Sequence, residues 1–289
     1  MAFFIQELNE LLQRKEELPT LPDVVFQLHA ALEDENVSQG QIADIIERDP
    51  ALTARMLRVG NSALFNTGVE ISTVLGAIQR LGIREVRATC IVLSVVKCFS
   101  DKGTGLNHQM FWDHCAAVGL VTRLLWKKLK KFGGPVGADD LYVAGLLHDV
   151  GLLLLDQFFP EKFKETQEVR ELSGDPLWKS EDLVLGMDHG EIGGLLLGCW
   201  QLPESLTRIV AAHHNPDSGP EEIRDAAMVV NVAEEVCGKE GSSWSLEGSV
   251  ELDPAEKVAS LGMEAGDVDD VLQALEDIND GSEGLLEAA

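Results

Sequence analysis

The sequence has few of the features that define secreted, membrane-spanning or disulfide-stabilised proteins. Its five cysteines, at positions 90, 98, 115, 199 and 237, form an odd number and include no Cys-x-x-Cys pair. This usage argues against a disulfide framework and a thiolate zinc site, and predicts free, buried thiols in a reducing compartment. Apolar runs such as 91–96 and 151–155 are far shorter than the roughly 20 residues of a membrane span. The first residues lack the basic region of a secretory signal. We therefore expect a cytoplasmic protein without membrane association.

Positive charge is also scarce. The chain has 23 Lys and Arg against 49 Asp and Glu, a formal net charge of −26. Nucleic acids and anionic membranes are bound through clustered positive charge, so the composition argues against general binding of either. One basic stretch is present, with Arg123, Lys127, Lys128, Lys130 and Lys131 at the end of an apolar-periodic segment. Cations at this position are typical of the C-terminal end of a helix.

Helical periodicity dominates the segments that are present. Residues 38–41 form a capping box before apolar positions 42, 45 and 46, and Asp49-Pro50 predicts the start of the next helix. Ser72 is predicted to cap a helix over 73–81, which ends at Gly82 in a left-handed cap. Further helices are predicted over 84–99, 109–131, 139–148, 152–158, 161–172, 179–185, 189–199, 203–213 and 221–237. No alternating run is long enough to indicate a strand, so the predicted fold class is all-α.

Composition divides the chain into three parts. A polar, glycine-containing break at 100–108 separates an N-terminal helical subdomain, 1–105, from a second helical subdomain, 106–237. Residues 238–289 hold 14 Asp and Glu but only two Lys, with amphipathic runs at 254–261 and 268–278. This last part is predicted to be a loosely attached acidic extension with a docking helix.

Histidines are concentrated in the second half of the chain. Five of the seven lie there, and an aspartate directly follows one of them: His114, His148-Asp149, His189, His213 and His214. Neutral imidazoles with one carboxylate suit Fe, Mn, Ni or Zn, whereas Ca²⁺ and Mg²⁺ prefer oxygen ligands. Adjacent ligands can share an ion where the backbone turns, and Gly151 would permit a turn. Such a cluster could hold one metal, or two bridged by Asp149, and generate a hydroxide for phosphoester hydrolysis. The alternative is a hydrogen-bonded polar cluster without metal.

The order His114, then His148-Asp149, then an acidic residue on a late helix is that of the HD-superfamily phosphohydrolases. Further motifs occur at 18–22 (LPTLP), 45–62 (IIERDPALTARMLRVGNS), 77–82 (AIQRLG), 111–114 (FWDH), 189–193 (HGEIG) and 200–203 (WQLP). In these segments the chain resembles the HDOD domain. The resemblance implies an N-terminal helical bundle packed on an HD-type helical bundle, as found in bacterial signalling proteins joined to regulatory domains. Most such domains lack hydrolase activity because their metal ligands have eroded.

The resemblance also implies a metal-ligand set. His114, His148, Asp149, His189, His213 and His214 match the ligand positions of the related HD-GYP phosphodiesterases, and the last ligand, normally Asp, falls at Glu234. Two departures concern activity. Leu152 replaces a lysine that helps to hold phosphate in active enzymes, and no Gly-Tyr-Pro motif follows His213-His214.

Two hypotheses remain. The first is a non-catalytic regulatory module of HDOD type that binds a metal and acts through a signalling partner protein or regulatory domain, with a nucleotide as a candidate ligand. The second is a metal-dependent phosphohydrolase or phosphodiesterase acting on a nucleotide or cyclic dinucleotide, in which Asp149 would be catalytic.

Overall fold

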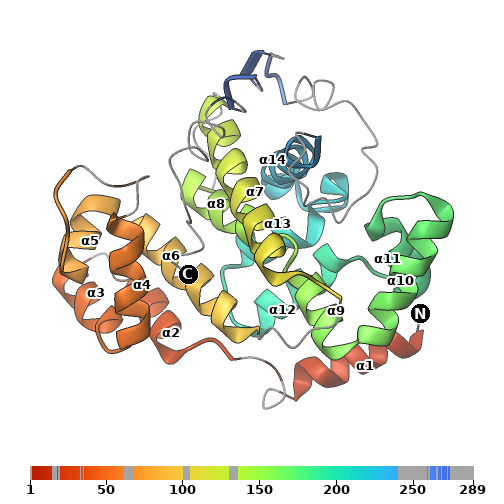
Figure 1. Cartoon of the computed structure of the whole chain (residues 1–289), viewed down its shortest axis with the longest axis horizontal. Coiled ribbons are helices and arrows are strands. Elements are labelled where there is room, and N and C mark those ends of the chain that lie inside the picture. The colour runs from red at the N-terminus through yellow and green to blue at the C-terminus, as the bar shows by residue number, and fades with distance from the viewer. Residues whose placement is uncertain are drawn as a thin grey trace. The chain divides into compact units, whose positions relative to one another are not determined.

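The chain forms helices throughout the part that the structure describes. This computed structural model describes residues 2–14, 18, 20–32, 34, 36–61, 65, 68–99, 105–129, 136–239, 259, 261–264, 266–267, 269–271 and 273. Within these ranges there are fourteen α-helices and one 3₁₀-helix, and no strand. The predicted all-α fold class is confirmed. The chain divides into two compact units, one of residues 19–99 and the other of residues 1–18 with 100–275 (Figure 1).

The 19–99 unit contains five helices: α2 (Asp23–Leu32), α3 (Gln39–Ile46), α4 (Pro50–Asn61), α5 (Val74–Leu81) and α6 (Ile83–Cys98). The capping box of Ser38 and Gln41 is present, as predicted. The cap of α5 differs by one residue from the prediction, because the Thr73 side chain, not that of Ser72, accepts the Gly76 N–H. Gly82 has a positive φ of 84°, but its ψ of 157° lies outside the left-handed helical region. The predicted left-handed cap is therefore wrong.

The second unit contains the remaining helices. They are α1 (Ala2–Gln13), α7 (His108–Lys128), α8 (Ala138–Leu147), α9 (Val150–Phe158), α10 (Pro160–Ser173), α11 (Leu177–Leu185), α12 (His189–Cys199), α13 (Glu204–Ala212), η1 (Pro216–Ser218) and α14 (Glu221–Lys239). Helix α7 packs on α8 and α14, and α12 packs on α9 and α13. Helix α1, which the sequence grouped with residues 1–105, belongs to this unit. The reason is apolar packing, since the Phe4 ring is buried and contacts the Phe159 ring edge-on, with ring centroids 5.1 Å apart.

Glycines allow the helices of this unit to approach closely. A Cβ on Gly151 would lie 2.0 Å from the His189 carbonyl oxygen, so the start of α9 contacts the start of α12 at a point where no side chain fits. The backbone does turn at His148 and Asp149, between α8 and α9. Gly151 is not the cause, because it is helical and has no positive φ. The role expected for Gly151 in that turn is wrong, and its role is close packing.

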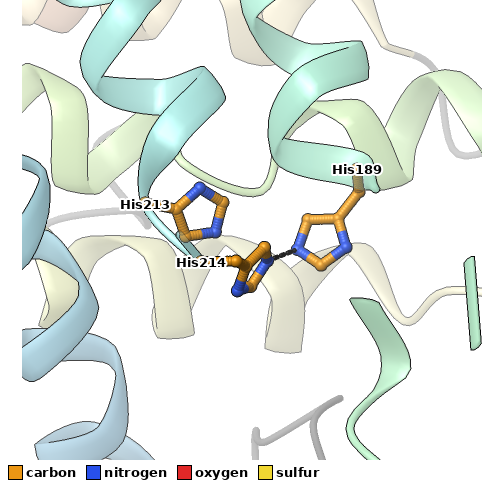
Figure 2. Close-up of side chains that lie close together, drawn as sticks. All are labelled: His189, His213 and His214. Carbon is orange, nitrogen blue, oxygen red and sulfur yellow. Dashed lines mark hydrogen bonds between the residues drawn. The ribbon is translucent and has the colours of Figure 1, made fainter. Parts of the chain in front are cut away.

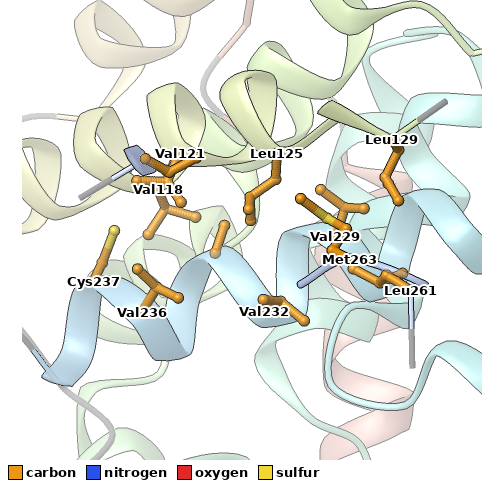
Figure 3. Packing of buried hydrophobic residues seen from close by; sticks show 12 residues of the cluster. Val118, Val121, Leu125, Leu129, Val229, Val232, Val236, Cys237, Leu261 and Met263 are labelled. Carbon is orange, nitrogen blue, oxygen red and sulfur yellow. The ribbon is translucent and has the colours of Figure 1, made fainter. Parts of the chain in front are cut away.

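Part of the acidic extension packs on α7 and α14. Leu261, Met263 and Val271 are buried in one apolar cluster with Val118, Leu125 and other residues of these two helices (Figure 3). Lys128 Nζ lies 3.2 Å from Asp267 Oδ1 and 2.6 Å from Asp270 Oδ2. The extension is thus attached by both apolar burial and ion pairs. Of the two predicted amphipathic runs, residues 254–258 and 260 of the first and residues 268, 272 and 274–278 of the second lie outside the described residues.

One stretch of the described chain, residues 140–158, is long and apolar enough to cross a membrane by length and composition alone. It spans α8, the His148-Asp149 turn and α9, and 89% of it is buried inside the fold. That burial is typical of the core of a soluble protein.

Candidate metal centre

Helix ends supply most of the predicted site residues. His148 follows α8 directly, Asp149 precedes α9, His189 is the first residue of α12, and His213 follows α13. Helix interiors contribute His114 on α7 and Glu234 on α14. All of these side chains are buried, and His214 is half-buried beside them. Side chains at helix ends can point along the helix axis, which lets helices of different direction contribute to one centre.

Asp149 lies at the middle of the histidines. Its Oδ1 atom is 3.0 Å from His189 Nε2, 3.2 Å from His148 Nε2 and 4.0 Å from His213 Nε2. Its Oδ2 atom is 3.6 Å from His114 Nε2. Four imidazoles from four different segments therefore surround one carboxylate.

His189, His213 and His214 form a compact group (Figure 2). The Nε2 atoms of His189 and His214 are 2.8 Å apart, and the rings of His213 and His214 have centroids 3.8 Å apart. Two imidazoles that bind one ion at right angles, with metal–nitrogen bonds of about 2.1 Å, have nitrogens roughly 3 Å apart. The observed spacing fits two ligands of a single ion.

The donor atoms fall into two groups that share His213. One group is His189, His213 and His214, and the other is His148, Asp149, His213 and Glu234. In each group the candidate donor atoms lie within 4.8 Å of one another. Glu234 enters through its Oε2 atom, 3.8 Å from His213 Nε2. All seven residues that the sequence predicted as ligands are thus brought together, with His114 joined through Asp149.

Backbone carbonyls fix the orientation of two of the rings. His148 Nδ1 is 2.7 Å from the Gly145 carbonyl oxygen, and His213 Nδ1 is 2.7 Å from that of Val210. If Nδ1 carries the proton in each ring, Nε2 is the basic nitrogen and faces the centre. The Nε2 atom of His213 is buried and makes no hydrogen bond with the described residues. A buried nitrogen without a partner is unfavourable, and a metal ion at this point would satisfy it.

The surroundings shift the pKa values of the donors. Burial opposes the ionisation of Asp149, but His148 and His189 outweigh it and hold the Asp149 pKa well below its usual value. Burial lowers the pKa of His114 to about 4, and burial with nearby histidines lowers the pKa values of His213 and His214. An ionised carboxylate and neutral imidazoles are the forms that bind metals.

His189 differs from the other imidazoles. Its burial disfavours the charged form, but Glu181 and Asp149 outweigh that effect and raise the His189 pKa well above its usual value. Without a metal, the protonated form of His189 is therefore favoured by the two carboxylates beside it. A metal ion that binds to its Nε2 would replace the proton there.

Two residues of α11 that were not predicted from the sequence contact the histidines. Glu181 is fully buried, with its Oε2 atom 2.6 Å from His189 Nδ1, and the Trp178 ring stacks on His214 at 5.6 Å. The sequence held a signal for Glu181, since it lies four residues from both Leu177 and Leu185 and so shares their apolar helix face. A carboxylate on such a face requires a buried partner.

Leu152 occupies the position where active relatives are expected to carry a phosphate-holding lysine. It lies in α9 and is fully buried, so its side chain belongs to the apolar core. The residue supplies neither positive charge nor access to a ligand.

An all-α fold with a buried His-Asp pair among further histidines defines a helical domain of the HD type. The HDOD domain model matches residues 18–216, and the chain belongs to the HDOD family. The match ends before α14, so the candidate ligand Glu234 lies outside it.

Solved structures and a curated relative support this assignment. An HDOD domain protein of unknown function from Geobacter sulfurreducens is 25% identical, with a TM-score of 0.75 over 94% of this chain and 95% of that one. A Shewanella amazonensis structure named provisionally as a phosphohydrolase is also 25% identical, with a TM-score of 0.66 over 92% of this chain and 97% of that one. An uncharacterized protein of Treponema pallidum is 26% identical over 223 residues. The match covers 76% of this chain but only 42% of that relative's length.

Proposed function

We propose that this chain is a regulatory module of HDOD type whose second unit binds one or two transition-metal ions without catalysing hydrolysis. The proposal depends on one observation, the two groups of donor atoms that share His213, all of them buried except the half-buried His214. Donors from α7, α8, α9, α12, α13 and α14, or from residues directly adjoining these helices, would be tied together by the ion. The metal would thus stabilise the folded second unit, through which the module would act on its partner.

The donor chemistry favours a transition metal. Imidazole nitrogens outnumber carboxylates among the seven candidate ligands, which suits Fe, Mn, Ni or Zn better than Ca²⁺ or Mg²⁺. A shared His213 cannot bind two ions through one Nε2 atom, and its Nδ1 faces the Val210 carbonyl. The second ion would therefore depend on Asp149, whose two carboxylate oxygens can bridge.

Two features argue against hydrolysis. Leu152 leaves the expected phosphate-holding position apolar and buried. The net charge of −26 also opposes the approach of a polyanionic substrate. A centre that holds a metal but does not attract phosphate suits a structural or sensing role.

We expect the module to act on a signalling partner protein or on a regulatory domain. The chain spans about 42% of the length of the Treponema pallidum relative, as would a module that occurs with other domains. A solved Marinobacter aquaeolei structure, named provisionally as a signal transduction protein, shares the fold with a TM-score of 0.77 at 21% identity, over 97% of this chain and 64% of that one. A nucleotide remains a candidate ligand of the module.

The alternative function is a metal-dependent phosphohydrolase or phosphodiesterase acting on a nucleotide or cyclic dinucleotide. The grouping of six of the seven predicted ligands favours it, and a Shewanella amazonensis structure is named provisionally as a phosphohydrolase. A bound metal would acidify water and so supply a hydroxide nucleophile. Asp149 would then hold the metal at the reacting centre, with His148 beside it.

Metal analysis combined with a turnover assay separates the two functions. The protein is purified without added metal, its metal content is measured, and a panel of phosphoesters is then tested with Mn²⁺, Fe²⁺, Ni²⁺ or Zn²⁺. The variant His148→Ala/Asp149→Ala removes two donors, and His29→Ala, in α2 of the other unit, is the matched histidine control. We expect metal in the parent protein and in His29→Ala, less metal in the double variant, which retains His189, His213 and His214, and no turnover in any of them. Turnover that disappears only in the double variant would establish the alternative.

A further inference from the structure

Helix α11 places a carboxylate where its neighbours on the same face are apolar. Glu181 is fully buried, as are Leu177 and Leu185, which lie one turn before it and one turn after it on the same face. A buried carboxylate is unfavourable unless charged or hydrogen-bonding groups surround it. The chain must therefore provide Glu181 with a specific partner.

Among the residues that the structure describes, that partner is His189. Glu181 Oε2 accepts hydrogen bonds from the backbone N–H of His189 at 2.8 Å and from His189 Nδ1–H at 2.6 Å. With Nδ1–H committed to Glu181, the opposite nitrogen, Nε2, lies 3.0 Å from Asp149 Oδ1 and 2.8 Å from His214 Nε2. The two bonds together fix both the position of the first residue of α12 and the rotation of its ring.

His189 differs in this respect from the other oriented rings. His148 and His213 hold their Nδ1 atoms against neutral backbone carbonyls, of Gly145 and Val210, within their own helices. His189 uses a charged acceptor from another helix. A carboxylate behind a ligating imidazole increases its basicity as well as fixing its orientation.

The neighbouring imidazole, His214, has a contact with α11 that does not involve Glu181. His214 stacks on Trp178 with an interplanar angle of 14°, and Trp178 precedes Glu181 by one turn on α11. A change at Glu181 that leaves the backbone of α11 intact would thus act on His189 and spare this stack. This separation makes the role of Glu181 measurable.

We propose that Glu181 is the positioning residue for His189, holding its Nε2 atom in place as a ligand of the metal centre. The inference rests on the proposed metal-binding function and names a residue outside the predicted ligand set. Partners of this kind typically change metal affinity by about 10- to 100-fold when they are removed.

The test compares Glu181→Gln with Glu168→Gln. Glutamine keeps the size and the acceptor oxygen at position 181 but removes the charge. Glu168, on α10 of the same unit, is 62% exposed and paired with Lys164. Its substitution therefore removes one charge from an exposed position. Each metal-free protein is titrated with Co²⁺, and binding is followed by the visible absorption of the bound ion. We expect a 10- to 100-fold weaker Kd and an altered spectrum for Glu181→Gln, with Glu168→Gln equal to the parent. Equal Kd values and spectra for all three would overturn the proposal.

A second readout needs no metal. In ¹⁵N-histidine-labelled, metal-free protein, the His189 Nδ1–H proton should give a downfield, slowly exchanging signal that is weakened or lost in Glu181→Gln and retained in Glu168→Gln. An unchanged signal in Glu181→Gln would overturn the positioning role.

If the parent protein fails to bind Co²⁺, the proposed function fails, and this signal alone decides whether Glu181 positions His189. If Glu181→Gln does not fold, Glu181→Asp is used, because it keeps the charge but withdraws the acceptor by one methylene, with the same expected and contradicting results.

Discussion

The Nε2 atoms of His189 and His214 lie 2.8 Å apart, although 25 residues separate the two histidines in the chain. Two basic nitrogens at this distance repel unless a proton or a metal ion lies between them. Because the His189 pKa is raised and the His214 pKa is lowered, His189 donates and His214 accepts in the absence of metal. The same geometry presents both nitrogens to an ion when the proton leaves.

Close packing at Gly151 should limit what this position tolerates. An added Cβ would meet the His189 carbonyl oxygen at 2.0 Å, so Gly151→Ala must separate α9 from α12. We expect the free energy of unfolding to fall by about 1–3 kcal/mol or more, measured by urea denaturation. Gly198→Ala is the matched control, since Gly198 is a helical glycine of α12 whose Cβ would meet nothing within 4 Å. The control should be neutral or slightly stabilising. Equal effects of the two substitutions would refute the packing argument.

Apolar burial, more than ion pairing, should hold the acidic extension on α7 and α14. Val271 is 1% exposed in the cluster, and Val271→Ala removes about two methylene equivalents, so it should lower the free energy of unfolding by about 2 kcal/mol. Lys128→Gln removes the pairs with Asp267 and Asp270 and should cost less than about 1 kcal/mol. Urea denaturation of both variants at low and high salt is the measurement. A larger loss for Lys128→Gln would contradict this order.

Three thiols should be unreactive in the folded protein. Burial is the main cause that raises the pKa values of Cys90, Cys115 and Cys237. The nearby carboxylates of Asp49 and Glu234 add smaller contributions at Cys90 and Cys237, respectively. Because the thiolate is the reactive form, iodoacetamide at pH 8 should label these positions only after unfolding. Cys98, whose pKa burial raises to about 11, should react faster as the pH increases toward that value. Mass spectrometry of peptides labelled with and without urea tests both statements, and rapid labelling of Cys90 in the native protein would contradict them.

Local chemistry was the most predictable part of the structure. Ser38 and Gln41 form the expected capping box because both partners lie within one turn of each other. The cap of α5 was misplaced by one residue because Ser72 and Thr73 both carry a hydroxyl group, and backbone geometry chose between them. The order of the histidine motifs also predicted residues that the fold brings together.

Long-range packing was less predictable. The amphipathic pattern of α1 indicates a buried face but does not identify Phe159 as the ring that Phe4 contacts. The apolar spacing around Glu181 likewise indicates burial without identifying His189 as its partner. Gly151 could be read as a turn residue because the sequence does not reveal that another helix approaches it. In each case the missing information was the identity of the neighbouring helix.

The central claim is that His148, Asp149, His213 and Glu234, together with His189 and His214, bind a transition metal. The most direct test is anomalous diffraction, recorded at the absorption edge of the metal found in crystals of protein purified without added metal. The account predicts one or two anomalous peaks at about 2.0–2.2 Å from these donor atoms, and loss of the peak beside His148 and Asp149 in crystals of the His148→Ala/Asp149→Ala variant. A parent crystal with no peak among these six residues, or with its metal bound elsewhere, would contradict the account.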